Sequence, residues 1–233
     1  MIQVEPFEKL GRFRNGWLNA RHHFSFGQHH DPRRMGVGAL RVWNDDEIAP
    51  GQGFDPHPHK EMEIITYVRA GAITHRDSLG NEGRTEAGDV QVMHAGTGIV
   101  HSEYNLEKTP TRIFQIWLVP DRTGVAPGWG ARSFPKDRSD ALAVLADGRT
   151  DADATALPLY ADGAVLAGTI RAGQTIRQTL APGRIAYLVP ATGSVTVNGT
   201  PVSTRDGATI TGETELEITA DSDAEIVLVD VAA

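Results

Sequence analysis

The sequence contains no cysteine among its 233 residues. This absence excludes disulfide bonds, thiolate metal ligands, a cysteine nucleophile and cysteine-based redox sensing. Any metal site in this chain must therefore be built from histidine and carboxylate side chains.

The sequence also lacks long apolar runs and an excess of basic residues. No stretch approaches the roughly 20 apolar residues that span a bilayer, and the first residues have neither the apolar segment nor the cleavage pattern of a secretory signal. We therefore expect a soluble, cytoplasmic protein without a membrane partner. The formal net charge of -8 disfavours direct binding of nucleic acid, because such binding requires clustered Lys and Arg.

Short runs rich in Val, Ile and Thr, bounded by Gly, Pro, Asn and Asp, recur along the chain and predict an all-β protein. Strands this short and frequent are typical of a sandwich or jelly roll. We expect strands at residues 37–43, 62–69, 89–94, 112–119, 164–170, 184–189, 194–197, 207–211, 214–219 and 225–230.

Two segments depart from this pattern. Residues 138–146 are expected to form a helix, with Ser139 and Asp140 as candidate caps. The segment from Pro120 to Pro135 is rich in Gly and Pro and lacks strand alternation, so it is interpreted as a linker.

A weak internal repeat is present. Residues 64–92 and 185–210 both have the pattern of strand, glycine turn, strand, turn and strand, which predicts two copies of one barrel. We expect a first domain at residues 1–135 and a second at 136–233.

His57 and His59 are separated by one residue and flanked by Pro56 and Pro58. The prolines favour an extended backbone and exclude a helix. Residues i and i+2 of a strand point to the same face, so both imidazoles can reach one ion.

His101 and Glu103 have the same spacing. On facing strands the two pairs would place three imidazole nitrogens and one carboxylate around one cavity. This ligand set suits Fe(II), Mn(II), Ni(II) or Cu(II) with open coordination positions and is less typical of structural zinc. A plainer interpretation, a surface loop around His57 and a core role for His101, stays open.

All nine histidines lie between positions 22 and 101. When the two repeats are aligned on their first glycines, Thr179 and Ala181 fall opposite His57 and His59. Neither side chain can replace an imidazole ligand. We therefore expect the first barrel to bind the metal and the second, a degenerate copy, to bind none.

The spacing around these residues resembles the two cupin motifs. Two departures are visible, because Gly71 falls one residue later than the usual cupin glycine and the second motif lacks its usual proline. The matching residues are Gly51, His57, His59 and Glu63 for the first motif, and Gly98, His101 and Asn105 for the end of the second.

The longer context resembles the pirin family of two-barrel cupins, through WLNARHHFSFGQHHDP at 17–32, DPHPHKEMEIITYVRAG at 55–71 and MHAGTGIVHSEYN at 93–105. It looks most like the bacterial pirin-like proteins for which quercetin 2,3-dioxygenase activity is described. The resemblance implies two cupin (jelly-roll) β-barrels in tandem, with three histidines and one glutamate on a metal in the first barrel only.

The fourth ligand differs between the two patterns. Generic cupins would use Glu63, whereas the pirin pattern uses the glutamate two residues after the last histidine, here Glu103. We favour Glu103, because it shares a strand face with His101 and the longer match is to pirins. The expected ligands are then His57, His59, His101 and Glu103, and Glu63 is expected to be a core-facing carboxylate paired with an Arg.

The resemblance implies a metal-dependent dioxygenase that acts with O₂ on a flavonol such as quercetin or a related aromatic enol. Fe(II) is the expected metal, with Mn, Ni, Cu or Zn as alternatives, and Glu103 is the catalytic candidate for accepting the substrate proton. The rival hypothesis is a metal-binding, redox-responsive regulatory protein that acts through a protein partner. A structural metal is a third possibility.

Several other side chains have open roles. One set either orients a ligand near the metal or lies in an exposed loop: His22, His23, His29 and His30. Another is expected to be structural, with His94 as a possible hydrogen-bond partner of the site: His75 and His94. A third either lines an apolar pocket or packs in the core: Phe24, Phe26 and Trp43.

Overall fold

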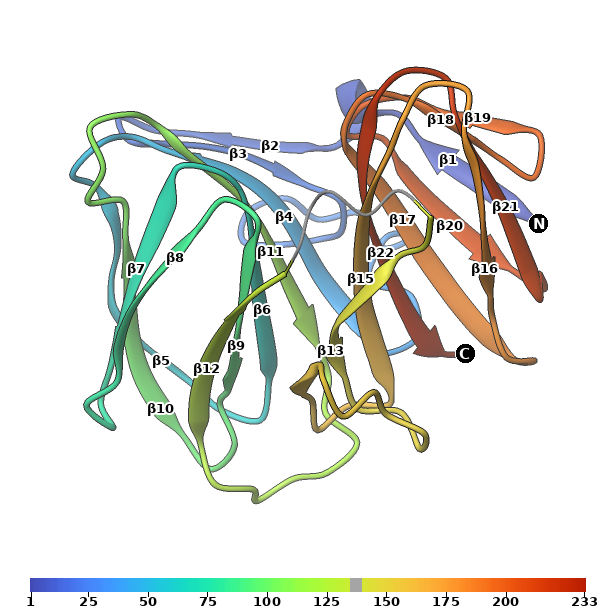
Figure 1. Cartoon of the computed structure of the whole chain (residues 1–233). Coiled ribbons are helices and arrows are strands. Elements are labelled where there is room, and N and C mark those ends of the chain that lie inside the picture. The colour runs from blue at the N-terminus through green and yellow to red at the C-terminus, as the bar shows by residue number, and fades with distance from the viewer. Residues whose placement is uncertain (135–139) are drawn as a thin grey trace.

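The computed structural model describes residues 1–134 and 140–233, and within them the chain forms 22 strands. The only helical element of this described part is a 3-10 turn, η1 (Phe7–Lys9). Figure 1 shows two barrels side by side, and the expected all-β bicupin fold is confirmed. No helix in these ranges is long and apolar enough to cross a membrane.

The first barrel consists of a seven-stranded and a four-stranded sheet, with orders β12-β9-β6-β11-β4-β3-β2 and β5-β10-β7-β8. Its strands are β2 (Gly11–Arg14), β3 (Leu18–His22), β4 (Leu40–Ile48), β5 (Gly53–His59), β6 (Glu63–Ala70), β7 (Ala72–Asp77), β8 (Glu82–Glu86), β9 (Asp89–His94), β10 (Ile99–Tyr104), β11 (Thr111–Leu118) and β12 (Gly128–Ser133).

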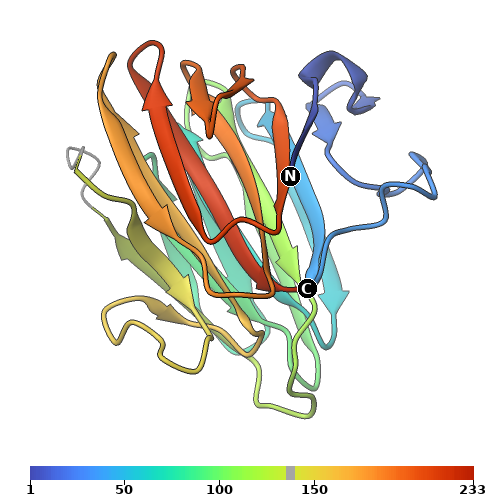
Figure 2. The ribbon, with the colours of Figure 1, turned by 90° about the vertical axis from the view of Figure 1, so that its right-hand side faces the viewer.

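The second barrel repeats this arrangement, with orders β1-β20-β17-β22-β15-β13-β14 and β16-β21-β18-β19. Although β1 is first in the chain, it pairs with β20, so both termini lie at the second barrel (Figures 1 and 2). The strands are β1 (Ile2–Glu5), β13 (Ala143–Asp147), β14 (Leu157–Pro158), β15 (Gly163–Ile170), β16 (Thr175–Thr179), β17 (Arg184–Thr192), β18 (Val195–Val197), β19 (Thr200–Val202), β20 (Gly207–Thr211), β21 (Glu215–Ala220) and β22 (Ala224–Ala232).

The two seven-stranded sheets pack against each other through one large apolar cluster. Trp43 of β4 lies at its centre, with its ring centroid 5.5 Å from that of Tyr187 in the second barrel. Because side chains alternate along a strand, Trp43 and Asp45 face the second barrel while Asn44 and Asp46 face the interior of the first.

The interiors of the two barrels differ in polarity. A single apolar cluster of buried residues fills the second barrel. The first contains two smaller clusters, one around Ile48 and Val68 and one around Ile64 and Met93. Polar side chains lie between these two clusters, so a buried polar site is a property of the first barrel.

All ten expected strands overlap with observed ones, but two predictions were wrong. In the described part of 138–146, the chain forms β13 rather than a helix, whereas Arg138 and Ser139 lie outside the described residues. The segment interpreted as a linker contains the edge strand β12, which pairs with β9. Tertiary pairing overrides weak local propensity in both places. The expected boundary between residues 135 and 136 also lies outside the described residues and stays a prediction.

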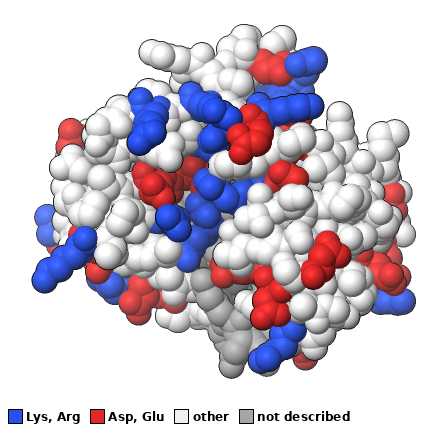
Figure 3. Space-filling view, turned by 90° about the horizontal axis from the view of Figure 1, so that it is seen from above, with Lys and Arg blue, Asp and Glu red and all other residues white. Residues whose placement is uncertain are grey.

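Charged groups on the face seen from above are of both signs, with basic side chains along its middle (Figure 3). Between the barrels, the buried carboxylate of Asp45 is paired with Arg69 of β6 and with Arg205, which follows β19. A buried carboxylate needs such partners, because each ionised oxygen has lost its water.

We expect Asp45→Ala to lower the free energy of unfolding by about 3–5 kcal/mol, because it leaves Arg69 buried without its counter-charge. The matched control is Glu47→Ala on the same strand, since Glu47 forms an exposed ion pair with Arg112 and such pairs contribute about 0–1 kcal/mol. Urea denaturation measures both variants. Equal losses for the two would contradict a structural role for the inter-barrel ion pairs.

Candidate metal centre

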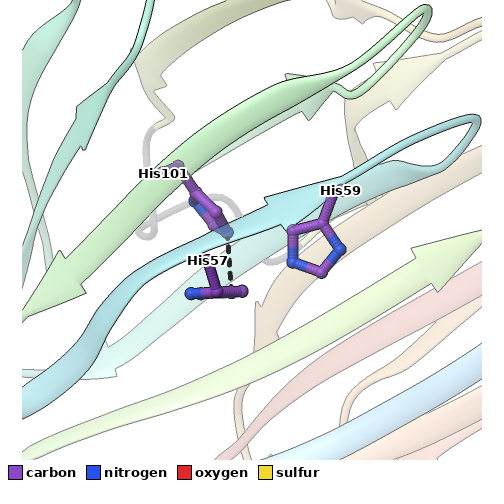
Figure 4. A group of neighbouring side chains, drawn as sticks. All are labelled: His57, His59 and His101. Atoms are coloured by element: carbon purple, nitrogen blue, oxygen red, sulfur yellow. Dashed lines mark hydrogen bonds between the residues drawn. The ribbon is translucent and has the colours of Figure 1, made fainter.

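Three histidines from β5 and β10 converge on one point (Figure 4). The strands are antiparallel, and His101 lies directly opposite His57. Their Nε2 atoms are 3.1 Å apart, and His59, on the same face of β5, has its ring centroid 5.1 Å from that of His101. The ligand atoms of the three side chains all lie within 4.8 Å of one another.

This geometry fits a bound transition-metal ion. Two nitrogens each about 2.1 Å from one ion and at a right angle to each other are about 3.0 Å apart, close to the 3.1 Å between the Nε2 atoms of His57 and His101. The Nδ1 of His57 lies 2.7 Å from the Asp55 carbonyl oxygen, and only a protonated Nδ1 can donate there. A His57 ring that is protonated on Nδ1 alone keeps the lone pair of Nε2 for a ligand.

Burial keeps the imidazoles of His59 and His101 in the neutral form that metals require. It lowers the pKa of His101 to about 3, with smaller contributions from the neighbouring His57 and His59. It lowers the pKa of His59 to about 4, again with a contribution from His57. Neither ring carries a proton on both nitrogens at neutral pH.

Glu103 lies deeper than the three histidines. Its side chain belongs to a second group of potential ligands, with His75 and His101, rather than to the group with His57 and His59. A shift in the β5–β10 register between His101 and Glu103 places Glu103 opposite Phe54. The spacing of two residues predicted a shared strand face, and the irregular pairing explains why the carboxylate is offset.

Three neutral donors hold the Glu103 carboxylate. Oε1 accepts hydrogen bonds from Gln91 Nε2 at 2.7 Å and from Thr66 Oγ1 at 3.1 Å, and Oε2 accepts one from Gln115 Nε2 at 2.6 Å. Burial raises the pKa of Glu103, and His75 and these donors offset only part of the rise. Each carboxylate oxygen can accept two hydrogen bonds or ligands, so Oε2 retains a free lone pair.

These donors are part of a polar row that crosses the inner face of the seven-stranded sheet. Pairing registers place His22 opposite Asn44, Asn44 opposite Gln115, Gln115 opposite Thr66, and Thr66 opposite Gln91. Five consecutive strands thus each contribute one polar side chain to the same level of the barrel. The row separates the two apolar clusters and lies beneath the histidines.

A second chain of contacts orients His101. Its Nδ1 lies 3.5 Å from Nδ1 of His75, whose Nε2 lies 3.0 Å from Oδ2 of Asp77. If His75 donates to Asp77, its Nδ1 can accept the Nδ1 proton of His101, which leaves Nε2 of His101 directed at the centre. Trp129 stacks on His75 at 5.0 Å, and Gly83 allows this because a Cβ there would lie 2.1 Å from the indole. The sequence assigned His75 a plain structural role, and its contact with His101 was missed.

His57 and His59 line a cavity of about 540 Å³. Aromatic side chains form its walls: Trp17 packs edge-on against Phe54 at 5.2 Å, and Trp117 packs against Phe26 at 5.5 Å and His59 at 5.0 Å. A cavity of this volume with a few convergent polar groups is typical of a small-molecule site.

Glu63 lies in neither group of potential ligands among the described residues. Its carboxylate is buried, lies 2.6 Å from His94 Nδ1 and accepts a hydrogen bond from the Tyr160 backbone N–H. The Arg partner expected from the sequence is thus replaced by His94 and Tyr160. Glu63 therefore links the first barrel to the segment that follows β14.

The remaining candidates separate into lining and packing residues. Of the aromatic set, Phe26 lines the cavity, whereas Phe24 and Trp43 lie in the core between the barrels. His22 is buried and lines the cavity, but His23 is enclosed between Trp43 and Tyr187. Of the four histidines expected either near the metal or in an exposed loop, His22 is therefore at the site and His23 is in the core.

Comparisons with known proteins identify the family of both barrels. Residues 3–118 match the Pirin family, and residues 148–231 match the quercetinase C-terminal cupin domain. The chain is 60% identical to a pirin-like protein of Caulobacter vibrioides over 233 residues, and 40% identical to a quercetin 2,3-dioxygenase of Escherichia coli over 233 residues; these alignments cover 100% and 99%, respectively, of both chains.

The crystal structure of the bacterial pirin YhhW of Escherichia coli in complex with nickel(II) is similar, with a TM-score of 0.93 at 38% identity over 100% of this chain and 99% of that one. From the two matched domains and these full-length relatives, we conclude that the chain belongs to the pirin family.

Proposed function

We propose that this chain is a metal-dependent dioxygenase that acts on a flavonol such as quercetin or a related aromatic enol. The observation that carries the proposal is the convergence of His57, His59 and His101, two of which, His57 and His59, line a cavity with aromatic walls. The quercetin 2,3-dioxygenase of Escherichia coli, 40% identical over 99% of its length, supports the substrate class. The cytoplasmic location expected from the sequence stays a prediction.

One divalent ion would be held by His57, His59 and His101, with Glu103 as the fourth ligand. The nickel(II) complex of the YhhW pirin supports a transition metal. Fe(II) remains our expected ion, and Mn, Ni, Cu and Zn remain alternatives. A metal held there supplies Lewis-acid polarisation of the adjacent hydroxyl and carbonyl oxygens of the substrate.

The surrounding residues would supply binding and proton transfer. Trp17, Phe54 and Trp117 offer flat surfaces for a planar aromatic molecule and exclude water from its faces. Glu103 would accept the substrate hydroxyl proton. Protonation would occur on Oε2, while Gln91 and Thr66 would hold the resulting carboxylic acid by Oε1.

We expect purified protein at full loading to contain about one metal ion per chain, and His57→Ala with His59→Ala to abolish it, because the pair supplies two of three converging nitrogens. Elemental analysis by mass spectrometry measures the content. His30→Ala is the control, since His30 lies exposed in a loop. Stoichiometric metal in the double variant would refute the site.

The two candidate carboxylates can be separated by comparing Glu103→Gln with Glu63→Gln. If Glu103 is a ligand, its variant should weaken metal affinity about 10-fold or more, whereas Glu63→Gln should mainly lower the melting temperature through the loss of its His94 and Tyr160 contacts. Competition titration against a chelator gives the affinity. A larger loss of affinity in Glu63→Gln would reverse the assignment.

We expect O₂ uptake with quercetin to rise in proportion to metal content and to be absent in the apoprotein, because the metal is the group that polarises the substrate oxygens. Anaerobic loading with Fe(II), Mn(II), Ni(II) or Cu(II), followed by measurement with an oxygen electrode, tests this. Turnover by metal-free protein would refute the mechanism. Failure with every ion across several aromatic enols would favour the regulatory hypothesis instead.

A further inference from the structure

Three buried polar atoms of the cavity have no hydrogen-bond partner within the described residues: Oδ1 of Asp46, Oδ1 of Asn44 and Nδ1 of His22. Asp46 is 2% exposed, and all three side chains line the same cavity as His57 and His59. Buried polar groups are normally paired. These three unpaired atoms lie on the adjacent strands β3 and β4. They therefore indicate a binding site for a ligand or for water.

The three side chains lie on the sheet opposite the β5 histidines. His22 and Asn44 are cross-strand partners, and Asp46 lies one inward-facing position further along β4, beside Ala20. This position is next to the apolar cluster that includes Trp17 and Phe54. The cavity thus has two groups of polar side chains. One is the histidine cluster, and the other, formed by Asp46, Asn44 and His22, is bordered by aromatic rings.

The protonation states of Asp46 and His22 indicate which class of ligand these side chains can bind. Burial, together with the nearby carboxylates of Asp45 and Glu103, raises the pKa of Asp46 to about 8, and Arg69 offsets only part of the rise. Burial lowers the pKa of His22 to about 4, with a contribution from His29. All three groups are then neutral at pH 7, and each can donate or accept. A neutral hydroxyl matches them, whereas an anion would be repelled by Glu103 and Asp45.

We propose that Asp46, with Asn44 and His22, forms a second recognition subsite that binds a phenolic hydroxyl of a planar aromatic substrate at the end remote from its metal-facing oxygens. The proposal rests on the proposed function for the orientation of the substrate. It adds a specificity determinant: the protein distinguishes polyhydroxylated flavonols from those that carry the 3-hydroxyl group alone.

The test compares two probes, quercetin and 3-hydroxyflavone, which share the adjacent oxygens but differ in remote hydroxyl groups. Binding to nickel-loaded protein is measured without O₂ at pH 6.5, by quenching of tryptophan fluorescence. We expect Asp46→Ala and Asp46→Leu to weaken quercetin binding about 10-fold and to leave binding of 3-hydroxyflavone unchanged. Asp46→Asn, which keeps one donor and one acceptor, should retain quercetin affinity.

The outcomes separate this proposal from the proposed function. If quercetin binds wild type and Asp46→Ala equally, the orphan atoms serve water only and the subsite is wrong, whether or not the enzyme consumes O₂. If the discrimination is present but no O₂ is consumed, the subsite holds and the dioxygenase proposal fails. Metal content measured on each variant ensures that a change in affinity does not come from loss of the ion.

Stability gives an independent readout of the neutral Asp46. Its carboxyl has a pKa of about 8 in the folded protein and an ordinary value of 3.8, so the unfolded chain gains by ionising as the pH rises above about 4. We expect Asp46→Asn to melt at a higher temperature than wild type at pH 7, and the difference to vanish near pH 4. Equal melting temperatures at pH 7 would show that Asp46 has a compensating partner and would overturn the subsite.

Discussion

The Glu103 carboxylate is buried inside the first barrel and must have its oxygens satisfied without water. A polar row across the opposite sheet meets that requirement, because Gln91, Thr66 and Gln115 direct their donors at Glu103. The row divides the apolar interior into two clusters and lines the cavity through His22, Asn44 and Gln115. In the second barrel the corresponding interior is one apolar cluster, and none of its residues falls in a group of potential metal ligands among the described residues.

Hydrogen-bond partners also orient two of the three histidines. The Asp55 carbonyl sets the tautomer of His57, and the contacts from Asp77 through His75 direct His101. Such partners reduce the freedom that each ligand loses on binding an ion. The orphan atoms of Asp46, Asn44 and His22 have the opposite character, since nothing in the described protein satisfies them. The first set favours a rigid metal centre, and the second favours an exchangeable ligand beside it.

The sequence predicted what depends on local spacing. The Pro56 and Pro58 context identified the strand that presents His57 and His59, and the internal repeat identified two barrels. It did not predict the features that depend on strand register. These are the displacement of Glu103 by irregular β5–β10 pairing, the pairing of Glu63 with His94, and the polar row. The five members of that row are scattered along the sequence from His22 to Gln115. Residues that lie side by side only after strands pair leave no signature in a single sequence. The expected helix failed for the same reason, because pairing with β15 turns residues 143–147 into a strand.

The central claim is that one metal ion per chain is held where the β5 and β10 histidines meet. Anomalous diffraction from crystals of nickel-loaded protein tests it most directly. We predict a single strong peak about 2.0–2.2 Å from the Nε2 atoms of His57 and His101 and from one ring nitrogen of His59, with Glu103 completing the set. A peak centred instead on His75, His101 and Glu103, or one in the second barrel, would contradict the account.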